Sequence, residues 1–198
     1  MSTLERSALK EWAVLCDAMA GGDIIALVRK GGIREQRAGF SVRHDRFLLY
    51  PTFFHEKAAE LAPRFAGALP SSHADRPPAG VVRLALVASV AAVWAVDDLD
   101  RMRAIEDEHG LGWDAVSSRF HYRQRPGVQV IAVEVARLRE AAEVPELPRY
   151  AGCVSWVELE TGADVEHSRR VVPRSDFDAR LRRLRDALGA PLEESPNT

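Results

Sequence analysis

The stretch VVRLALVASVAAVWAV, residues 81–96, is the longest apolar run of the chain and decides the fold class. It is shorter than the ~20 residues that a membrane-spanning helix needs, and Arg83 lies near its start. We therefore interpret it as a buried strand of a sheet. No membrane association is expected.

Helices are predicted on both sides of this strand. Apolar residues recur at helical spacing over about 9–20, 54–65, 98–109, 113–120 and 175–188. Gly21-Gly22 and Gly110 follow two of these segments, and glycine readily adopts the left-handed conformation that ends a helix. The buried stripe predicted for the last helix consists of Phe177, Leu181, Leu184 and Leu188.

The remaining apolar segments predict strands. They lie at 23–29, 40–42, 47–50, 127–135 and 152–159, and the first two are expected to form a hairpin with a basic connection. Residues 67–80, rich in Pro, Gly and Ser, predict a loop. Strands and helices intermix without a βαβ rhythm, which indicates an α+β fold: a small mixed, mainly antiparallel sheet flanked by helices, with a PUA-like β-barrel as one form that it could take.

Composition sets broad limits. A chain of 198 residues fits one domain and can bury roughly 70% of its unfolded surface, so residues 1–190 are expected to be a single globular domain and 191–198 a flexible tail. The formal charge of −2 permits only local charge arguments.

Cys16 and Cys153 lack metal-ligand spacing and are expected to be two reduced thiols or one bridge. Neither a metal nor a cofactor is expected. Without a secretory signal, the expected compartment is the cytoplasm.

The first candidate site is the basic segment 29–46. Its local charge is about +4 before His44 is counted. Backbone N–H groups at Gly31 and Gly32 could approach a phosphate, and neighbouring aromatic side chains could stack on bases. Alternatively, the glycines form only a turn, the cations are solvated and the aromatics belong to the core. The cations are Arg29, Lys30, Arg34, Arg37, Arg43 and Arg46, and the aromatics are Phe40, Phe47 and Tyr50.

Two further basic clusters follow. Residues 119–125, Arg-Phe-His-Tyr-Arg-Gln-Arg, could stack on unpaired bases and pair with phosphates, or could be a surface loop with ordinary ion pairs. The arginines of the last helix, together with Arg169, Arg170 and Arg174, are more typical of a solvated helix face.

A catalytic group is harder to assemble from the sequence. A histidine beside a carboxylate could serve as a general base, and Glu35 with His44 or His55 is the best candidate. However, the chain contains no HExxH, GxSxG or P-loop motif. A lone histidine among aromatics is more often a hydrogen-bonded core residue. The other polar residues in suitable contexts are Glu11, Asp45 and Cys153.

Four segments together carry a resemblance to a known family. They are ALKEWAV (8–14), LVRKGGIRE (27–35), RFLLYPTFFH (46–55) and YAGCVSWVEL (150–159). In this order they resemble an uncharacterised bacterial family, the domain of unknown function numbered 1802, over nearly the whole chain. Some members are joined to a restriction-endonuclease-like module, so the resemblance implies a nucleic-acid-related or defence role.

A looser likeness concerns the order of elements. A Gly-containing turn after the first strand, a long strand, a helix and a closing strand after Phe-His-Tyr are similar to the ASCH and EVE members of the PUA-like superfamily. Those are small β-barrels that bind RNA or modified bases, and some ASCH-like proteins are amidohydrolases with Lys, Thr and Glu in the cleft. Lys30 and Glu35 could match the Lys and the carboxylate, but no Thr follows Lys30.

The leading hypothesis is a nucleic-acid or modified-nucleotide binding domain, with RNA or DNA as partner. The alternatives are a hydrolase or nuclease acting on nucleic acid or a modified nucleoside, and a non-catalytic protein-interaction module. The predicted ligand-binding residues are Arg29, Lys30, Gly31, Gly32, Arg34, Glu35, His44, Tyr50 and His55.

Overall fold

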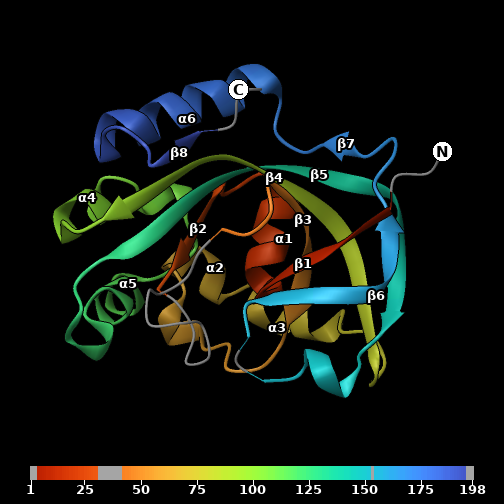
Figure 1. Ribbon diagram of the computed structural model, residues 1–198. Helices are drawn as coiled ribbons and strands as arrows, with labels where there is room; N and C mark the ends of the chain where they lie inside the picture. The colour runs from red at the N-terminus through yellow and green to blue at the C-terminus, as the bar shows by residue number, and fades with distance from the viewer. Residues whose placement is uncertain (1–3, 31–41, 153, 195–198) are drawn as a thin grey trace.

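Helices and strands alternate irregularly along the chain (Figure 1). The computed structural model describes residues 4–30, 42–152 and 154–194. The strands are β1 (Leu4–Trp12), β2 (Ala26–Arg29), β3 (Arg46–Thr52), β4 (Val81–Val96), β5 (Val128–Pro145), β6 (Trp156–Asp164), β7 (Arg169–Arg170) and β8 (Glu193–Glu194). The helices are α1 (Ala13–Gly21), α2 (Pro63–Ala66), α3 (Leu69–Ala74), α4 (Leu99–Arg103), α5 (Trp113–Phe120) and α6 (Arg174–Leu188), with short 3-10 helices at Ala58–Glu60, Glu106–Glu108, Tyr122–Gln124 and Pro148–Tyr150.

The strands form one sheet in the order β2-β5-β4-β3-β1-β6, with β7 paired to β5 and β8 to β4. β1 and β3 are parallel, and the other pairings of the described strands are antiparallel. The long β4–β5 ribbon has register shifts after Leu84 and after Val90, and such bulges bend and twist a ribbon. The predicted α+β class with a mixed, mainly antiparallel sheet is confirmed.

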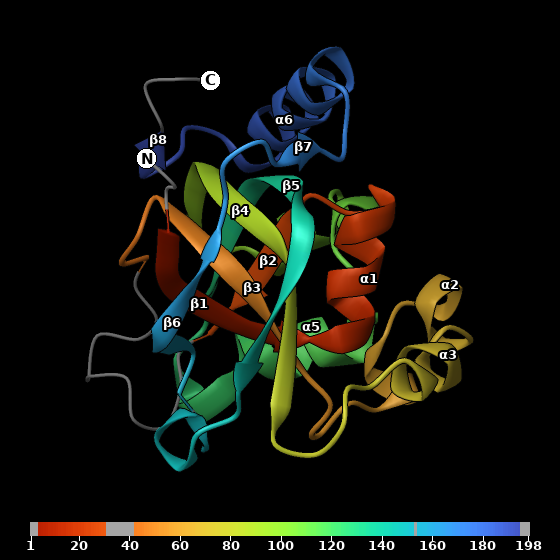
Figure 2. The ribbon, with the colours of Figure 1, turned by 90° about the vertical axis from the view of Figure 1, so that its right-hand side faces the viewer.

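The two faces of the sheet contribute to different hydrophobic cores. Along β1 and β3, alternate side chains point to opposite faces, so Leu9 and Leu49 join one core and Ala8 and Leu48 join the other. The larger core lies between the sheet and helices that include α1, α5 and α6. Figure 2 shows α1 beside the sheet, with α2 and α3 beyond it.

The last helix packs as its pattern predicts. Its stripe Phe177, Leu181, Leu184 and Leu188 is buried, and α6 lies at the opposite end of the molecule from α3 and α5 (Figures 1 and 2).

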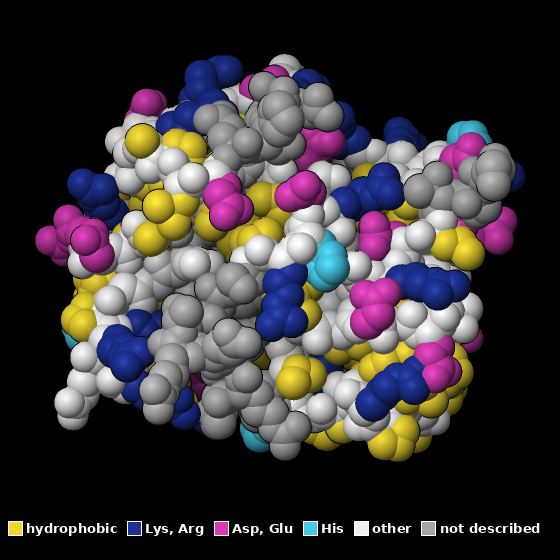
Figure 3. Space-filling view, in the orientation of Figure 1, with side chains coloured by type: hydrophobic (Ala, Val, Ile, Leu, Met, Phe, Trp, Pro, Cys, Tyr) yellow, Lys and Arg dark blue, Asp and Glu magenta, His cyan; other side chains and the backbone are white. Residues whose placement is uncertain are grey.

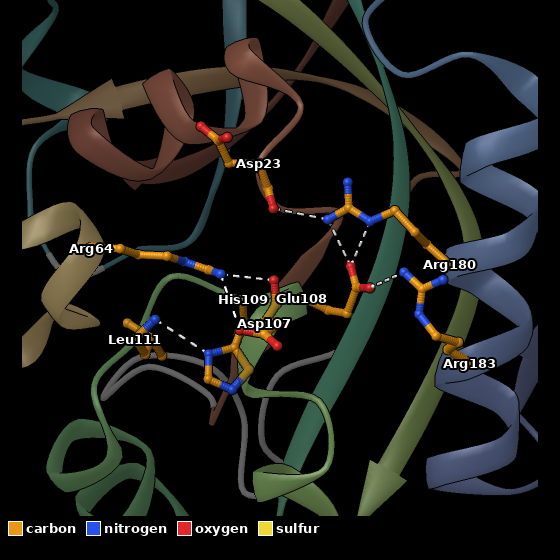
Figure 4. A network of polar contacts seen from close by, with 8 residues as sticks. All are labelled: Asp23, Arg64, Asp107, Glu108, His109, Leu111, Arg180 and Arg183. Carbon is orange, nitrogen blue, oxygen red and sulfur yellow. Dashed lines mark hydrogen bonds and ion pairs between the residues drawn. The ribbon is translucent and has the colours of Figure 1, made fainter.

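A buried carboxylate also holds α6. Glu108 accepts hydrogen bonds from Arg180 at 2.7 Å and from Arg183 at 3.1 Å (Figure 4). Arg180 donates in addition to the carbonyl oxygens of Gly22 and Asp23, at 2.6 and 2.9 Å. Arg180 and Arg183, two arginines of the last helix, therefore hold this helix against the loop after α1 and the segment after α4. Arg182 of the same helix is exposed.

Several element boundaries differ from the prediction. The segment expected to begin the first helix is strand β1, because Ala8 and Leu9 are both buried between β3 and β6 and the helix starts only at Ala13. The helix expected at 54–65 is interrupted, since Pro63 cannot occupy a helix interior and instead begins α2. The loop expected at 67–80 contains α3, and the helix expected at 98–109 is α4 followed by a 3-10 turn.

Other predictions concern pairing and the chain ends. β2 pairs with β5. Residues 40 and 41 lie outside the described residues, so the predicted hairpin of 23–29 with 40–42 stays a prediction. Within the stretch expected to be a tail, Glu193–Glu194 pair with β4. Cys16 is buried as a free thiol, and burial raises its pKa, whereas Cys153 lies outside the described residues. No helix among the described residues is long and apolar enough to cross a membrane.

Candidate functional site

A cavity of about 1260 Å³ lies where several strands end. β1 and β3 run parallel with Glu11 beside Pro51 and Trp12 beside Thr52, so their carboxyl ends meet at one edge of the sheet. The end of β2, one face of α1 and the end of α5 also line it, together with residues from 53–55, 72–79, the first part of β4, 146–152 and 154–155. The site therefore combines segments from distant parts of the sequence.

A buried ion pair stands at the end of β1 and β2. Arg29 donates to a carboxylate oxygen of Glu11 at 3.0 Å and to the carbonyl of Lys10 at 2.6 Å, and the two paired side chains expose only 16% and 7%. The second carboxylate oxygen of Glu11 accepts the Trp12 N–H at 2.8 Å. Removal of either member would leave a buried charge uncompensated, which typically costs several kcal/mol. This pair fixes the cavity wall.

Lys30 joins the first two basic clusters of the sequence. Its ammonium group donates to the carbonyl oxygens of Phe120, at 3.0 Å, and of Arg125 and Gly127. Burial, and then the nearby Arg125, lower the pKa of Lys30. Lys30 therefore holds the connection between α5 and β5 in place, and its donors already have partners.

An arginine lies over an indole ring within the wall. The guanidinium of Arg119 lies 5.1 Å from the ring centroid of Trp12, close enough for a cation–π attraction, and donates to the carbonyl of Val28 at 3.4 Å. Burial lowers the pKa of Arg119. Since arginine starts from a very high pKa, the group remains charged at neutral pH.

The described lining residues carry more positive than negative charge. Seven lysines and arginines face four carboxylates, which favours an anionic occupant. On the face shown in Figure 3, lysine and arginine side chains are interspersed with aspartate and glutamate.

The structure brings together only part of the predicted site. Arg29, Lys30, Tyr50 and His55 line the cavity. His44 is not among its lining residues; its ring packs edge-on against Trp156 at 5.2 Å. The remaining predicted residues, Gly31, Gly32, Arg34 and Glu35, lie outside the described residues, so a pairing of Glu35 with a histidine stays a prediction.

Two of the predicted residues have unexpected surroundings. Tyr50 was expected to offer a stacking face, but its ring is 2% exposed and packs edge-on against Tyr150 in the smaller core. Burial raises the pKa of its hydroxyl, which has no hydrogen-bond partner among the described residues. His55 is exposed, and its φ of 63° is uncommon for a residue other than glycine.

Sequence reasoning missed Lys10 and Trp12 as lining residues. Both lie near the end of β1, in the segment that was predicted to be helical. In a strand, residues two apart share a face, so recognition of the strand would have placed them together. Among the described residues, no group of three or more His, Cys, Asp or Glu side chains could hold a metal ion.

Comparisons with known proteins give a family and a distant structural likeness. The family model described as "Domain of unknown function (DUF1802)" matches residues 8–183. The solved structures similar to this chain include ASCH from Zymomonas mobilis (13% identity, TM-score 0.43, 90% of this chain and 94% of that chain) and a mutant of the ASCH protein from the same organism (12%, 0.44, 81% and 92%). No curated protein matches.

Proposed function

The chain belongs to the DUF1802 family, whose description assigns no function, and we propose that it binds a nucleotide or a nucleic acid strand in the cavity at the ends of β1, β2 and β3. One observation carries this proposal: two basic and aromatic segments, about ninety residues apart in the sequence, contact each other. Lys30 of the first segment donates to the carbonyl oxygens of Phe120 and Gly127 in and beside the second. Neither segment forms the site alone.

The size and lining of the cavity suit such a ligand. Pockets for small molecules usually measure about 300–1,000 Å³, so a volume of about 1260 Å³ can hold a nucleotide with room for its neighbours. The wall supplies aromatic rings as well as cations, a combination with which proteins bind single-stranded nucleic acids.

Different cations have different roles in this proposal. Arg29 and Lys30 are engaged with protein oxygens, so they shape the wall and add to its positive potential. Lys10 is engaged in the same way, since its ammonium group donates to the carbonyl oxygens of Tyr150 and Gly152. Arg76, an exposed cation of the cavity lining, is better placed to meet a phosphate. The phosphate contacts would position the ligand and carry no sequence information.

The test is a fluorescence-polarisation titration with short labelled RNA and DNA, single-stranded and double-stranded, between about 50 and 200 mM salt. Wild type is expected to bind, with an affinity that falls as salt rises. Arg76→Ala is expected to weaken binding and to reduce the slope of log K against log salt by about 1, because one phosphate contact is lost. Thermal unfolding of each variant verifies that it is folded.

The matched control is Arg182→Ala, which removes an exposed cation from α6, at the other end of the molecule. It is expected to bind like wild type. A folded wild type that binds none of the probes at the lowest salt would refute the proposal. Equal losses in Arg76→Ala and Arg182→Ala would show that binding is unspecific and not centred on the cavity.

A further inference from the structure

Phe54 is a largely exposed apolar side chain at the rim of the cavity. It follows the end of β3 by two residues, lines the cavity and exposes 63% of its surface. A single exposed ring is ordinary on a protein surface and needs no function by itself. Here, however, the neighbouring side chains hold the ring in a defined arrangement.

An arginine lies against this ring and its neighbour. The guanidinium of Arg76 is 5.5 Å from the ring centroid of Phe54 and 5.1 Å from that of Phe53, and all three residues line the cavity. Cation–π attraction restrains the otherwise mobile arginine and both rings. We call Phe53, Phe54 and Arg76 the rim cluster.

A buried carboxylate connects the rim cluster to the helices. The side chain of Glu56 has no exposed surface; it accepts the N–H of Val14 in the first turn of α1 at 3.1 Å and contacts His73 of α3 at 2.5 Å. The ring of His73 in turn packs edge-on against Phe53, with centroids 5.8 Å apart. The rim cluster is thereby fixed relative to α1 and α3, and through α1 to the cavity wall.

The backbone explains why neighbouring side chains point in different directions. His55 adopts φ 63°, in the left-handed region, between exposed Phe54 and buried Glu56. For residues other than glycine this conformation costs free energy, and it persists only where the surroundings enforce it. The turn at His55 directs the carboxylate inward to its anchors while the preceding ring remains accessible.

We propose that the rim cluster is a stacking site for an unpaired base of a nucleic acid strand that enters the cavity. This inference rests on the proposed function and specifies its substrate class. Aromatic rings and guanidinium planes both stack on bases. A base within a duplex already has neighbours on both faces, so only an unpaired base can reach a ring in this position. The ligand is therefore a single strand, a loop or an unpaired end rather than a duplex.

The test separates the contribution of the base to binding from that of the phosphates. Labelled oligothymidylate, an abasic strand with the same number of phosphates and a blunt DNA duplex are titrated against wild type, Phe54→Ala and Phe54→Trp. Phe54→Ala is expected to weaken oligothymidylate binding roughly 5-fold or more, from the usual contribution of one stacked base. The same variant should leave the abasic strand unaffected, and Phe54→Trp should restore binding because it retains a stacking face.

Leu192→Ala is the matched control, since Leu192 is 65% exposed, apolar and not among the lining residues. It should bind like wild type. If wild type binds the strand but Phe54→Ala binds it equally well, or if the abasic strand or the duplex binds as tightly as oligothymidylate, the stacking site is refuted while the proposed function stands. If wild type binds no probe, both fail.

Discussion

Acidification from pH 7 to pH 5 is expected to destabilise the protein through His109. This side chain is 2% exposed, and its Nδ1 accepts the N–H of Leu111 at 3.3 Å (Figure 4). Burial is the main cause that lowers its pKa to about 4. The nearby Met102 backbone and Asp107 oppose this shift, whereas Arg119 and Arg64 add to it. The folded protein therefore holds the ring neutral where an unfolded chain would protonate it.

The magnitude follows from the two pKa values. The unfolded chain binds a proton near pH 6.5 and the folded chain only near pH 4, so the unfolded state gains stability as the pH falls between these values. Each pKa unit corresponds to 1.36 kcal/mol, so between pH 7 and pH 5 the group removes roughly 2 kcal/mol from the free energy of unfolding. Below pH 4 both states bind the proton, and the loss stops growing.

Urea denaturation at pH 7 and pH 5 measures this effect. Because carboxylates also titrate, the informative quantity is the difference between wild type and His109→Asn, whose neutral side chain can still accept the Leu111 N–H. The variant is expected to lose roughly 2 kcal/mol less than wild type on acidification. His121→Asn, at an exposed position, is the control and should behave like wild type. An equal pH dependence in wild type and His109→Asn would refute the reasoning.

Three substitutions test other parts of the fold. Arg180→Ala is expected to lower the free energy of unfolding by about 3 kcal/mol, because Glu108 loses a buried partner; a loss below about 0.5 kcal/mol by urea denaturation would contradict this role. Phe177→Ala, at a fully buried position, should cost about 3–5 kcal/mol in the same assay, and full stability would show that α6 does not anchor the core. Lys30→Met leaves three carbonyls without their donor, so hydrogen exchange should accelerate around 120–127; unchanged protection there would contradict the anchoring role.

The fold class and the last helix could be predicted because their signals are local. Phe177, Leu181 and Leu184 repeat at helical spacing, and their helix buries one face only. The first helix was misplaced because β1 continues into α1 without a breaker: Leu9 and Trp12 match the spacing of Ala13 and Cys16 by coincidence. Both sides of a buried strand carry apolar residues, which obscures the period of two.

The cavity could be predicted only in part because its geometry depends on contacts distant in sequence. Basic and aromatic composition marked both the segment around Lys30 and the cluster that begins at Arg119. Nothing in either segment indicates that the amino group of Lys30 meets the carbonyl of Phe120. Likewise, Glu11 was noted as a polar residue, but only the pairing of β1 with β3 and of β2 with β5 brings it to Arg29.

The β4–β5 ribbon couples the stability of the two cores. Val82 and Leu84 belong to the smaller core, whereas Val93 and Trp94 of the same strand belong to the larger one. If the β4–β5 pairing is lost at one end of the ribbon, the hydrogen bonds that continue toward the other end are weakened. We therefore expect the two cores to unfold together, so that a stabilising substitution in either core also stabilises the cavity wall.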